Sequence, residues 1–257
     1  MNKTVLITGA TSGLGLEFSK IFSKNGYNLV IVGRNKEKLK LIKKHMKKLY
    51  NIQIYAMSID LTKDKSAHKI FNFLKENKIN VDILVNNAGF GDFGEFANSN
   101  LQKQIDMINL NITSLVKLSY LFINSTNKHN GKKILNIASI AGFQSGPLMS
   151  VYYATKAFVL SFSDALQFEL KNKNITVTTL CPGPVKTKFE CNANLKSSGL
   201  FKNIKPMDAK DVAIFGYNAL MKNKSVVIAG KINNGIVLCS KLLPRKFIKN
   251  MVYLIQK

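Results

Sequence analysis

Short apolar runs alternate along this chain with longer segments in which apolar side chains recur every three or four residues. A short apolar run between turn residues indicates a buried strand, and helical recurrence indicates an amphipathic helix. Strands are therefore predicted at 5–7, 28–32, 52–59, 83–85, 134–138, 175–180 and 225–228. Helices are predicted after residue 15 and at 35–48, 63–77, 100–127, 151–171 and 209–222. Strands that alternate with such helices form a parallel sheet with right-handed crossovers, so an α/β domain is predicted.

The first strand runs directly into the sequence Thr-Gly-Ala-Thr-Ser-Gly-Leu-Gly at residues 8–15. Glycines at 9, 13 and 15 remove side chains where a backbone must turn sharply and approach a phosphate. The helix that follows offers free N–H groups and the positive end of its dipole to negative charge. An ordinary turn would not need three glycines at this spacing, so a strand, a glycine turn and a helix in succession predict a dinucleotide site.

The second strand ends in Gly33 and Arg34, where an NAD-binding unit would carry an acidic residue for the ribose 2′-hydroxyl. A guanidinium can instead bind a 2′-phosphate through two parallel hydrogen bonds. The sequence therefore favours NADP over NAD. The alternative is that Arg34 is only a surface charge.

Side chains that could move a proton gather between the fifth strand and the next helix. Ser139 follows the strand, and Tyr152 and Lys156 lie four residues apart at the helix start. Residues four apart share a helix face, and a neighbouring cation favours the ionised form of a phenol, whose free pKa is about 10. We therefore expect Lys156 to lower the pKa of Tyr152 and make it a general acid or base, with Ser139 bonding the same substrate oxygen. Taken alone, such a pair can also be a packed ring beside a solvated amine.

Together these motifs resemble the short-chain dehydrogenase/reductase family, in its NADP-preferring type, over residues 3 to about 230. The resemblance rests on residues 8–15, Asn-Asn-Ala-Gly at 86–89, Asn111, Ser139, Tyr-x-x-x-Lys at 152–156 and Pro-Gly at 182–183. It implies a Rossmann-type, doubly wound, seven-stranded parallel sheet in a single domain. It also implies an oxidoreductase that transfers hydride between NADP(H) and a carbonyl or alcohol.

The resemblance further implies roles for individual residues. Tyr152 would be the general acid or base, Lys156 would also bond the nicotinamide ribose, Ser139 would position the substrate oxygen, and Asn111 would hold a water in the proton relay. The implied cofactor-binding residues are Gly9, Thr11, Ser12, Gly13, Leu14, Gly15, Arg34, Asp60, Leu61, Asn87, Ala88, Gly89, Tyr152, Lys156, Pro182, Gly183, Val185 and Thr187. No metal site is implied. The alternative is a non-catalytic NADP-binding sensor or scaffold, against which the intact Ser139, Tyr152 and Lys156 argue.

Substrate identity is less clearly encoded. Several apolar side chains near the expected pocket suggest an apolar substrate, such as an oxo-acyl chain, a steroid-like ketone or a xenobiotic carbonyl. They are Phe90, Phe93, Phe143, Leu148, Met149 and Phe189, which could equally belong to the core. The segment 188–206 lacks periodicity and is either a substrate lid or a linker. The helix at 151–171 is apolar on more than one side and needs two burial surfaces, so a homodimer or homotetramer is predicted.

Composition narrows the class of protein. The 257 residues, 46% apolar and 20% charged, are expected to form one globular domain. The net charge of +24 would attract polyanions, but the lysines are scattered and no recognition motif accompanies them, so no specific nucleic-acid role is predicted. Cys181, Cys191 and Cys239 form neither a paired framework nor a metal pattern, which favours a reducing, cytoplasmic location. No signal peptide or membrane-spanning run is recognised.

Residues 231–257 are predicted to be an amphipathic helical extension beyond the family core. An apolar stripe recurs there at helical spacing, formed by Phe247, Ile248, Met251, Val252 and Ile255, with Lys246, Lys249 and Asn250 elsewhere on the helix. Such a helix can lie peripherally on an anionic membrane. It can also pack on its own protein, as a lid over the pocket or on a neighbouring subunit, and the sequence favours this second arrangement.

Overall fold

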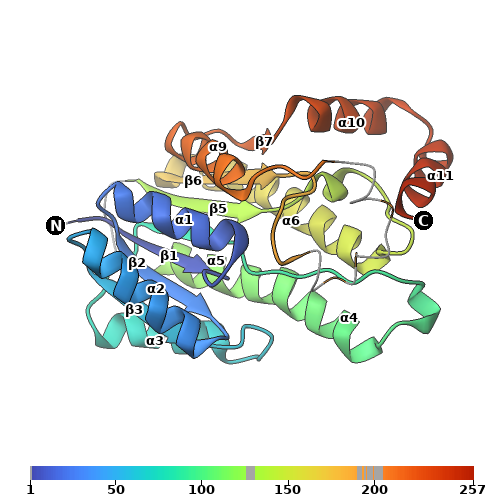
Figure 1. Cartoon of the computed structure of the whole chain (residues 1–257). Coiled ribbons are helices and arrows are strands. Elements are labelled where there is room, and N and C mark those ends of the chain that lie inside the picture. Colours follow the sequence, from blue (N-terminus) through green and yellow to red (C-terminus); the bar gives the residue numbers. More distant parts are fainter. Residues whose placement is uncertain (1, 126–130, 190–192, 194, 196–198, 200–204) are drawn as a thin grey trace.

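The computed structural model describes residues 2–125, 131–189, 193, 195, 199 and 205–257 (Figure 1). Its strands are β1 Thr4–Thr8, β2 Asn28–Gly33, β3 Ile54–Ser58, β4 Ile83–Asn86, β5 Lys132–Ile137, β6 Ile175–Cys181 and β7 Val226–Ile228. They form one seven-stranded parallel sheet in the order β3-β2-β1-β4-β5-β6-β7. The seven strands predicted from the sequence and the doubly wound Rossmann-type sheet are confirmed. The strand order reverses between β1 and β4, and such a reversal opens a crevice at the carboxyl ends of the strands.

Helices cover both faces of the sheet (Figure 1). They are α1 Gly13–Lys24, α2 Lys36–Leu49, α3 Ser66–Glu76, α4 Leu101–Ile108, α5 Ser114–Asn124, α6 Ser150–Glu169, α9 Ala209–Met221, α10 Lys231–Leu242 and α11 Arg245–Gln256. On one face, Phe18 and Phe22 of α1 pack in a fully buried cluster with Val5 of β1. On the other, Phe122 of α5 packs with Leu6, the next residue of β1. Successive residues of a strand point to opposite faces, so a strand buried on both sides is apolar throughout.

The predicted helix at 100–127 is interrupted in the structure. A wide π-helical turn, Asn109–Thr113, separates α4 from α5, and the Ser114 N–H bonds the Asn109 carbonyl five residues back. π-turns of this kind are often found at functional sites. This turn carries Asn111, whose side chain is buried between α6 and the loop after β4.

The C-terminal residues form two helices, α10 and α11, that pack on the rest of the domain. Ile248 and Val252 are buried in a cluster with Met149 and Tyr153, and Gln256 donates a 2.7 Å hydrogen bond to the Tyr153 hydroxyl. The expectation that the apolar stripe packs on its own protein is therefore confirmed for Ile248 and Val252. The division of the chain at residue 230 stays a prediction.

The expectations about membrane spans, the cysteines and the segment 188–206 are tested only in part. In the part of the chain that the structure describes, no helix is long and apolar enough to cross a bilayer. Cys181 and Cys239 are free thiols, and Cys191 lies outside the described residues. Much of the segment 188–206, expected to be a lid or a linker, also lies outside them. The cytoplasmic location stays a prediction.

Candidate active site

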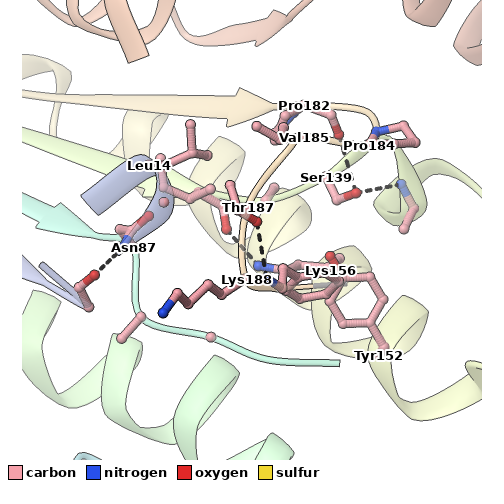
Figure 2. Close-up of a pocket in the computed structure, with 18 of the residues that line it drawn as sticks. Leu14, Asn87, Ser139, Tyr152, Lys156, Pro182, Pro184, Val185, Thr187 and Lys188 are labelled. Carbon is pink, nitrogen blue, oxygen red and sulfur yellow. Dashed lines mark hydrogen bonds between the residues drawn. The ribbon is translucent and has the colours of Figure 1, made fainter. Parts of the chain in front are cut away.

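A pocket runs along the carboxyl ends of the strands, from the glycine turn after β1 to the C-terminal helices. It brings together eighteen of the predicted site residues: Gly9, Thr11, Ser12, Gly13, Leu14, Arg34, Asp60, Leu61, Asn87, Ala88, Gly89, Ser139, Tyr152, Lys156, Pro182, Gly183, Val185 and Thr187. Figure 2 shows part of this set, with Leu14 and Asn87 on one side and Ser139, Tyr152 and Lys156 on the other. Gly15 and Asn111 lie behind the pocket wall and support it.

The glycine turn is held closely against the loop after β4. The Asn87 side chain donates hydrogen bonds to the Thr8 carbonyl at 2.8 Å and to the Gly9 carbonyl at 3.3 Å. A Cβ on Gly15 would lie 2.4 Å from the Gly9 oxygen and 2.5 Å from the Asn87 amide nitrogen. Gly9 itself has φ +67°, a conformation that favours glycine. The turn therefore keeps its shape only because Gly15 has no side chain.

The N-terminus of α1 opens into the pocket. Gly13 and Leu14 line it, and the Ser12 side chain makes no capping hydrogen bond to the first turn. The first turn also contains no acidic residue. The first N–H groups of a helix lack intrahelical partners and carry partial positive charge. This end of the pocket therefore fits the pyrophosphate of a dinucleotide.

Arg34 and Asp60 lie at the outer end of the pocket, where β2 and β3 finish. Arg34 is exposed, and Gly33 before it packs under Thr11, whose methyl carbon would lie 2.7 Å from a Cβ there. Burial raises the pKa of the Asp60 carboxyl. The hydrogen bonds from Thr62 and the positive charge of Arg34 together outweigh this effect, so the net shift of the pKa is downward. Asp60 is therefore ionised at neutral pH, and Arg34 is close enough to contribute to this.

Ser139, Tyr152 and Lys156 meet at the inner part of the pocket. The Ser139 hydroxyl accepts a hydrogen bond from the Ala141 N–H at 3.1 Å and contacts the Pro182 carbonyl at 3.3 Å (Figure 2). The Lys156 amine donates to the Ile137 carbonyl at 2.8 Å and lies 5.8 Å from the centre of the Tyr152 ring. The end of β5 and the first turns of α6 thus hold these side chains together.

The titration of Tyr152 and Lys156 differs from the sequence-based expectation. Burial raises the pKa of the Tyr152 phenol, and the hydrogen bond with Ser139 only partly offsets this. Burial also lowers the pKa of the Lys156 amine to about 8. The predicted lowering of the phenol pKa by Lys156 is therefore wrong for this structure. The physical reason is that the amine bonds Ile137 and loses part of its own charge near pH 8, while desolvation favours the neutral phenol.

Asn111 connects the loop after β4 to α6. Its side-chain amide donates to the Phe90 carbonyl at 2.9 Å and to the Thr155 hydroxyl at 3.0 Å, while its oxygen accepts from the Phe90 N–H at 3.1 Å. A Cβ on Gly89 would lie 2.9 Å from that oxygen. Asn111 therefore braces the pocket from behind, and its part in a proton relay stays a prediction.

The far end of the pocket is mainly apolar and differs from what the sequence suggested. Of the six expected apolar residues, Met149 and Phe189 line it in the part of the chain that the structure describes. Phe93 packs in the cluster behind them, and Phe143 packs in a separate cluster beneath α6. Val252 and Ile255 of the tail stripe also line it, as one of the two predicted arrangements of that stripe implied, whereas sequence reasoning did not place Tyr153, Leu195, Ile236 and Gln256 there. The helical stripe of the tail was a signal for Val252 and Ile255, whereas no motif marks Ile236 or Gln256.

The strand order and the glycine turn at the β1–β4 reversal define a dinucleotide-binding protein of the Rossmann type. Residues 3–197 match the family model described as short chain dehydrogenase. The chain belongs to this family, whose members are oxidoreductases that use a nicotinamide cofactor. The resemblance inferred from the sequence motifs is confirmed.

Individual relatives support the same assignment. The very-long-chain 3-oxoacyl-CoA reductase of Rattus norvegicus is 31% identical over 196 residues, which cover 74% of this chain and 61% of that protein. The NADP-dependent 3-hydroxy acid dehydrogenase of Schizosaccharomyces pombe is 28% identical over 236 residues, covering 88% and 90%. A short-chain dehydrogenase from Sphingobium yanoikuyae, solved in complex with NADPH, has a TM-score of 0.81 at 26% identity and covers 95% and 97%. This chain thus spans less than two thirds of the length of the rat reductase.

Proposed function

We propose that this protein transfers hydride between NADP(H) and the carbonyl or alcohol carbon of an apolar substrate. The observation that carries the proposal is that Ser139, Tyr152 and Lys156 line one pocket, with the Lys156 amine 5.8 Å from the centre of the Tyr152 ring, where the cofactor crevice meets an apolar wall. The glycine turn, the open N-terminus of α1 and Arg34 provide the groups that a phosphorylated dinucleotide needs. NADPH would supply the hydride when bound in this crevice.

The residues of this chain would supply position and a proton. Ser139 would hydrogen-bond the substrate oxygen, and Tyr152 would donate its phenolic proton to that oxygen as negative charge develops on it. Because burial raises its pKa, Tyr152 keeps this proton at neutral pH, which suits an acid in the direction of reduction. Lys156 would bond the nicotinamide ribose. In the reverse direction Tyr152 would take the proton from an alcohol.

The remaining pocket residues would hold the two halves of the cofactor. Gly9 to Gly15 would surround the pyrophosphate, and Asp60 with Asn87 would flank the adenosine half. Val185 and Thr187 would flank the carboxamide, on the side of the crevice next to Ser139. Asn111 would contribute by bracing the loop that carries Gly89.

For the substrate we infer an oxo-acyl group. The far wall is lined by apolar side chains, which suits a hydrocarbon chain better than a sugar. The names of two relatives, a 3-oxoacyl-CoA reductase and a 3-hydroxy acid dehydrogenase, both place the reacting oxygen at carbon 3 of an acyl group. A steroid-like or xenobiotic ketone is the second candidate, because 17-beta-hydroxysteroid dehydrogenase type 3 of Mus musculus is 32% identical over 200 residues.

The cofactor preference tests the proposal through Arg34. Purified protein should oxidise NADPH in the presence of an oxo-acyl thioester and should use NADH poorly. Arg34→Ala should raise the KM for NADPH about 100-fold and leave that for NADH nearly unchanged, because charge-assisted hydrogen bonds to the 2′-phosphate, together about 3 kcal/mol, are lost.

Lys36→Ala is the matched control, since Lys36 is an exposed cation two residues further along. It should leave both KM values within about twofold, as expected for a surface charge. Equal loss in the two variants, or better activity of the wild type with NADH, would contradict the NADP assignment. NADPH binding without turnover of any carbonyl substrate would favour the alternative of a sensor or scaffold.

We also propose that the protein is a homodimer or homotetramer. Large apolar side chains are exposed on the outer side of α6 and on α5, with Phe168 78% and Tyr120 66% exposed, and Phe158 and Phe162 stack at 5.7 Å. Apolar surface of this kind is typical of subunit interfaces. Analytical ultracentrifugation at micromolar concentration should give twice or four times the mass of the chain, and a single monomer peak would contradict this proposal.

A further inference from the structure

The turn between α10 and α11 has an unusual surface. Its seven residues, 241–247, read Lys-Leu-Leu-Pro-Arg-Lys-Phe, and all seven are exposed. Leu242 is 75% exposed, Leu243 40% and Phe247 52%. We call this segment the α10–α11 corner. Single exposed apolar residues are common, but several together with basic neighbours mark a surface that contacts something.

The apolar surface continues from the corner along both helices. Phe247, Met251 and Leu254 recur at helical spacing on α11 and are all exposed. On α10, Leu238 and Leu242 are four residues apart and are exposed as well. In Figure 1 these two helices, drawn in dark red, lie on the opposite side of the view from α2 and α3. This end of the molecule therefore presents a long apolar stripe.

The charge of this region has one sign. Residues 231–257 contain six basic residues, namely Lys231, Lys241, Arg245, Lys246, Lys249 and Lys257, and no acidic residue. All six are exposed. Long basic side chains beside exposed apolar ones can reach lipid phosphates while the apolar groups enter the acyl region. A second copy of this face would bring six more positive charges, so the charges oppose pairing of two copies through it.

The inner side of the same helices belongs to the pocket. Ile236 of α10 and Val252, Ile255 and Gln256 of α11 line its apolar end, while Gln256 bonds the Tyr153 hydroxyl. Two neighbouring helices thus carry the exposed stripe on one side and the wall of the substrate pocket on the other. Whatever covers the stripe comes within one helix diameter of that wall.

We propose that the α10–α11 corner docks this protein on an anionic phospholipid membrane. The exposed apolar side chains enter the interface, and the basic side chains bind lipid phosphates. The docked protein holds its pocket wall at the membrane surface, where an acyl-chain substrate resides. This last step rests on the proposed reductase function, whereas the docking itself does not.

Co-sedimentation of the full chain with lipid vesicles tests the docking. The wild type should bind vesicles of phosphatidylcholine with about 30% phosphatidylserine at least about fivefold more than pure phosphatidylcholine, because basic residues are attracted to anionic lipid. The triple variant Arg245→Glu, Lys246→Glu and Lys249→Glu should lose about tenfold or more of that binding. The double variant Leu242→Ser and Phe247→Ser should lose about fivefold or more, because the apolar contribution is removed. None of these residues lines the pocket.

Helix α2 offers matched controls, because it is also basic and partly exposed. Lys44→Glu, Lys47→Glu and Lys48→Glu change the net charge by the same amount, and Leu41→Ser with Leu49→Ser remove exposed leucines of 66% and 56%. Both controls should bind vesicles within about twofold of the wild type. An equal loss in the α2 variants, or a wild type that stays in the supernatant, would overturn the proposal. So would corner variants that change the mass in ultracentrifugation and keep vesicle binding, since the surface would then join two copies.

NADPH fluorescence in each variant verifies that the crevice is folded, and activity separates the two proposals. The corner variants should reduce a long-chain ketone carried in the vesicles at least about fivefold more slowly than the wild type, and a short water-soluble ketone at an unchanged rate. If the corner variants lose vesicle binding and no ketone is reduced by the wild type, the reductase proposal fails and the docking proposal stands. If the wild type reduces ketones and the corner variants bind vesicles as well as the wild type does, only the docking proposal fails.

Discussion

Replacing Tyr152 with Phe should lower the turnover of carbonyl reduction about 10²–10⁴-fold, the range that a positioned general acid contributes. The phenylalanine ring fills the same volume between Phe189 and the Tyr153 ring, so packing is kept and only the proton donor is lost. NADPH binding should stay within a few-fold of the wild type. Stopped-flow absorbance of NADPH oxidation measures the first effect, and fluorescence titration measures the second.

Tyr153→Phe is the matched control for this variant. Tyr153 is the neighbouring phenol, but its hydroxyl accepts a hydrogen bond from Gln256, and burial raises its pKa to about 12. Removing it should cost the hydrogen bond, about 1 kcal/mol of stability, and leave turnover within a few-fold. If Tyr152→Phe retained near wild-type turnover, or if Tyr153→Phe lost as much, Tyr152 would not be the acid.

Gly15→Ala should weaken NADPH binding about 100-fold and lower the free energy of unfolding by about 1–3 kcal/mol, the usual cost of forcing extra atoms into a packed site. The added methyl carbon would stand 2.4 Å from the Gly9 carbonyl oxygen and 2.5 Å from the Asn87 amide nitrogen, and the hydrogen bonds of that amide to Thr8 and Gly9 prevent an inexpensive adjustment. The turn would have to open, which moves the α1 N-terminus away from the pyrophosphate. Fluorescence titration and urea denaturation measure the two losses.

Gly235→Ala gives the reference for an added methyl group. A Cβ at Gly235 would meet no atom within 4 Å, and the residue lies in α10, where alanine favours the helix. This variant should be as stable as the wild type or about 0.5–1 kcal/mol more stable, with unchanged NADPH affinity. Wild-type affinity in Gly15→Ala would show that the close contact behind the turn is not required.

The elements that the sequence predicts correctly are those whose signals are local. The five inner strands are mostly apolar because both faces of the sheet are buried there, and each is therefore visible in a short window, whereas the edge strands β3 and β7 are only half-buried. The break at Asn109–Thr113 is different. It depends on bonds from Asn111 to Phe90 and Thr155, which are 21 and 44 residues away. No pattern within the helix encodes it.

The same distinction applies to the candidate site. The glycine turn and the Tyr152–Lys156 pair are compact motifs, so spacing alone brings their members together. Gln256 reaches the pocket by bonding Tyr153, which is 103 residues earlier in the chain, and only the folded packing of α11 places it there. The direction of the Tyr152 pKa was also missed, because it depends on how deeply the phenol is buried.

The brace formed by Asn111 limits how this protein can diverge. One carboxamide fixes the distance between the loop at 87–90 and the helix that carries Tyr152 and Lys156, so neither can be altered without refitting the other. On the wall contributed by α10 and α11, Gln256 bonds Tyr153 of α6, whereas the side chains of Ile236, Val252 and Ile255 are apolar and form no hydrogen bonds. Directed evolution toward new substrates should therefore sample Ile236, Val252 and Ile255 first, where diversity is least constrained.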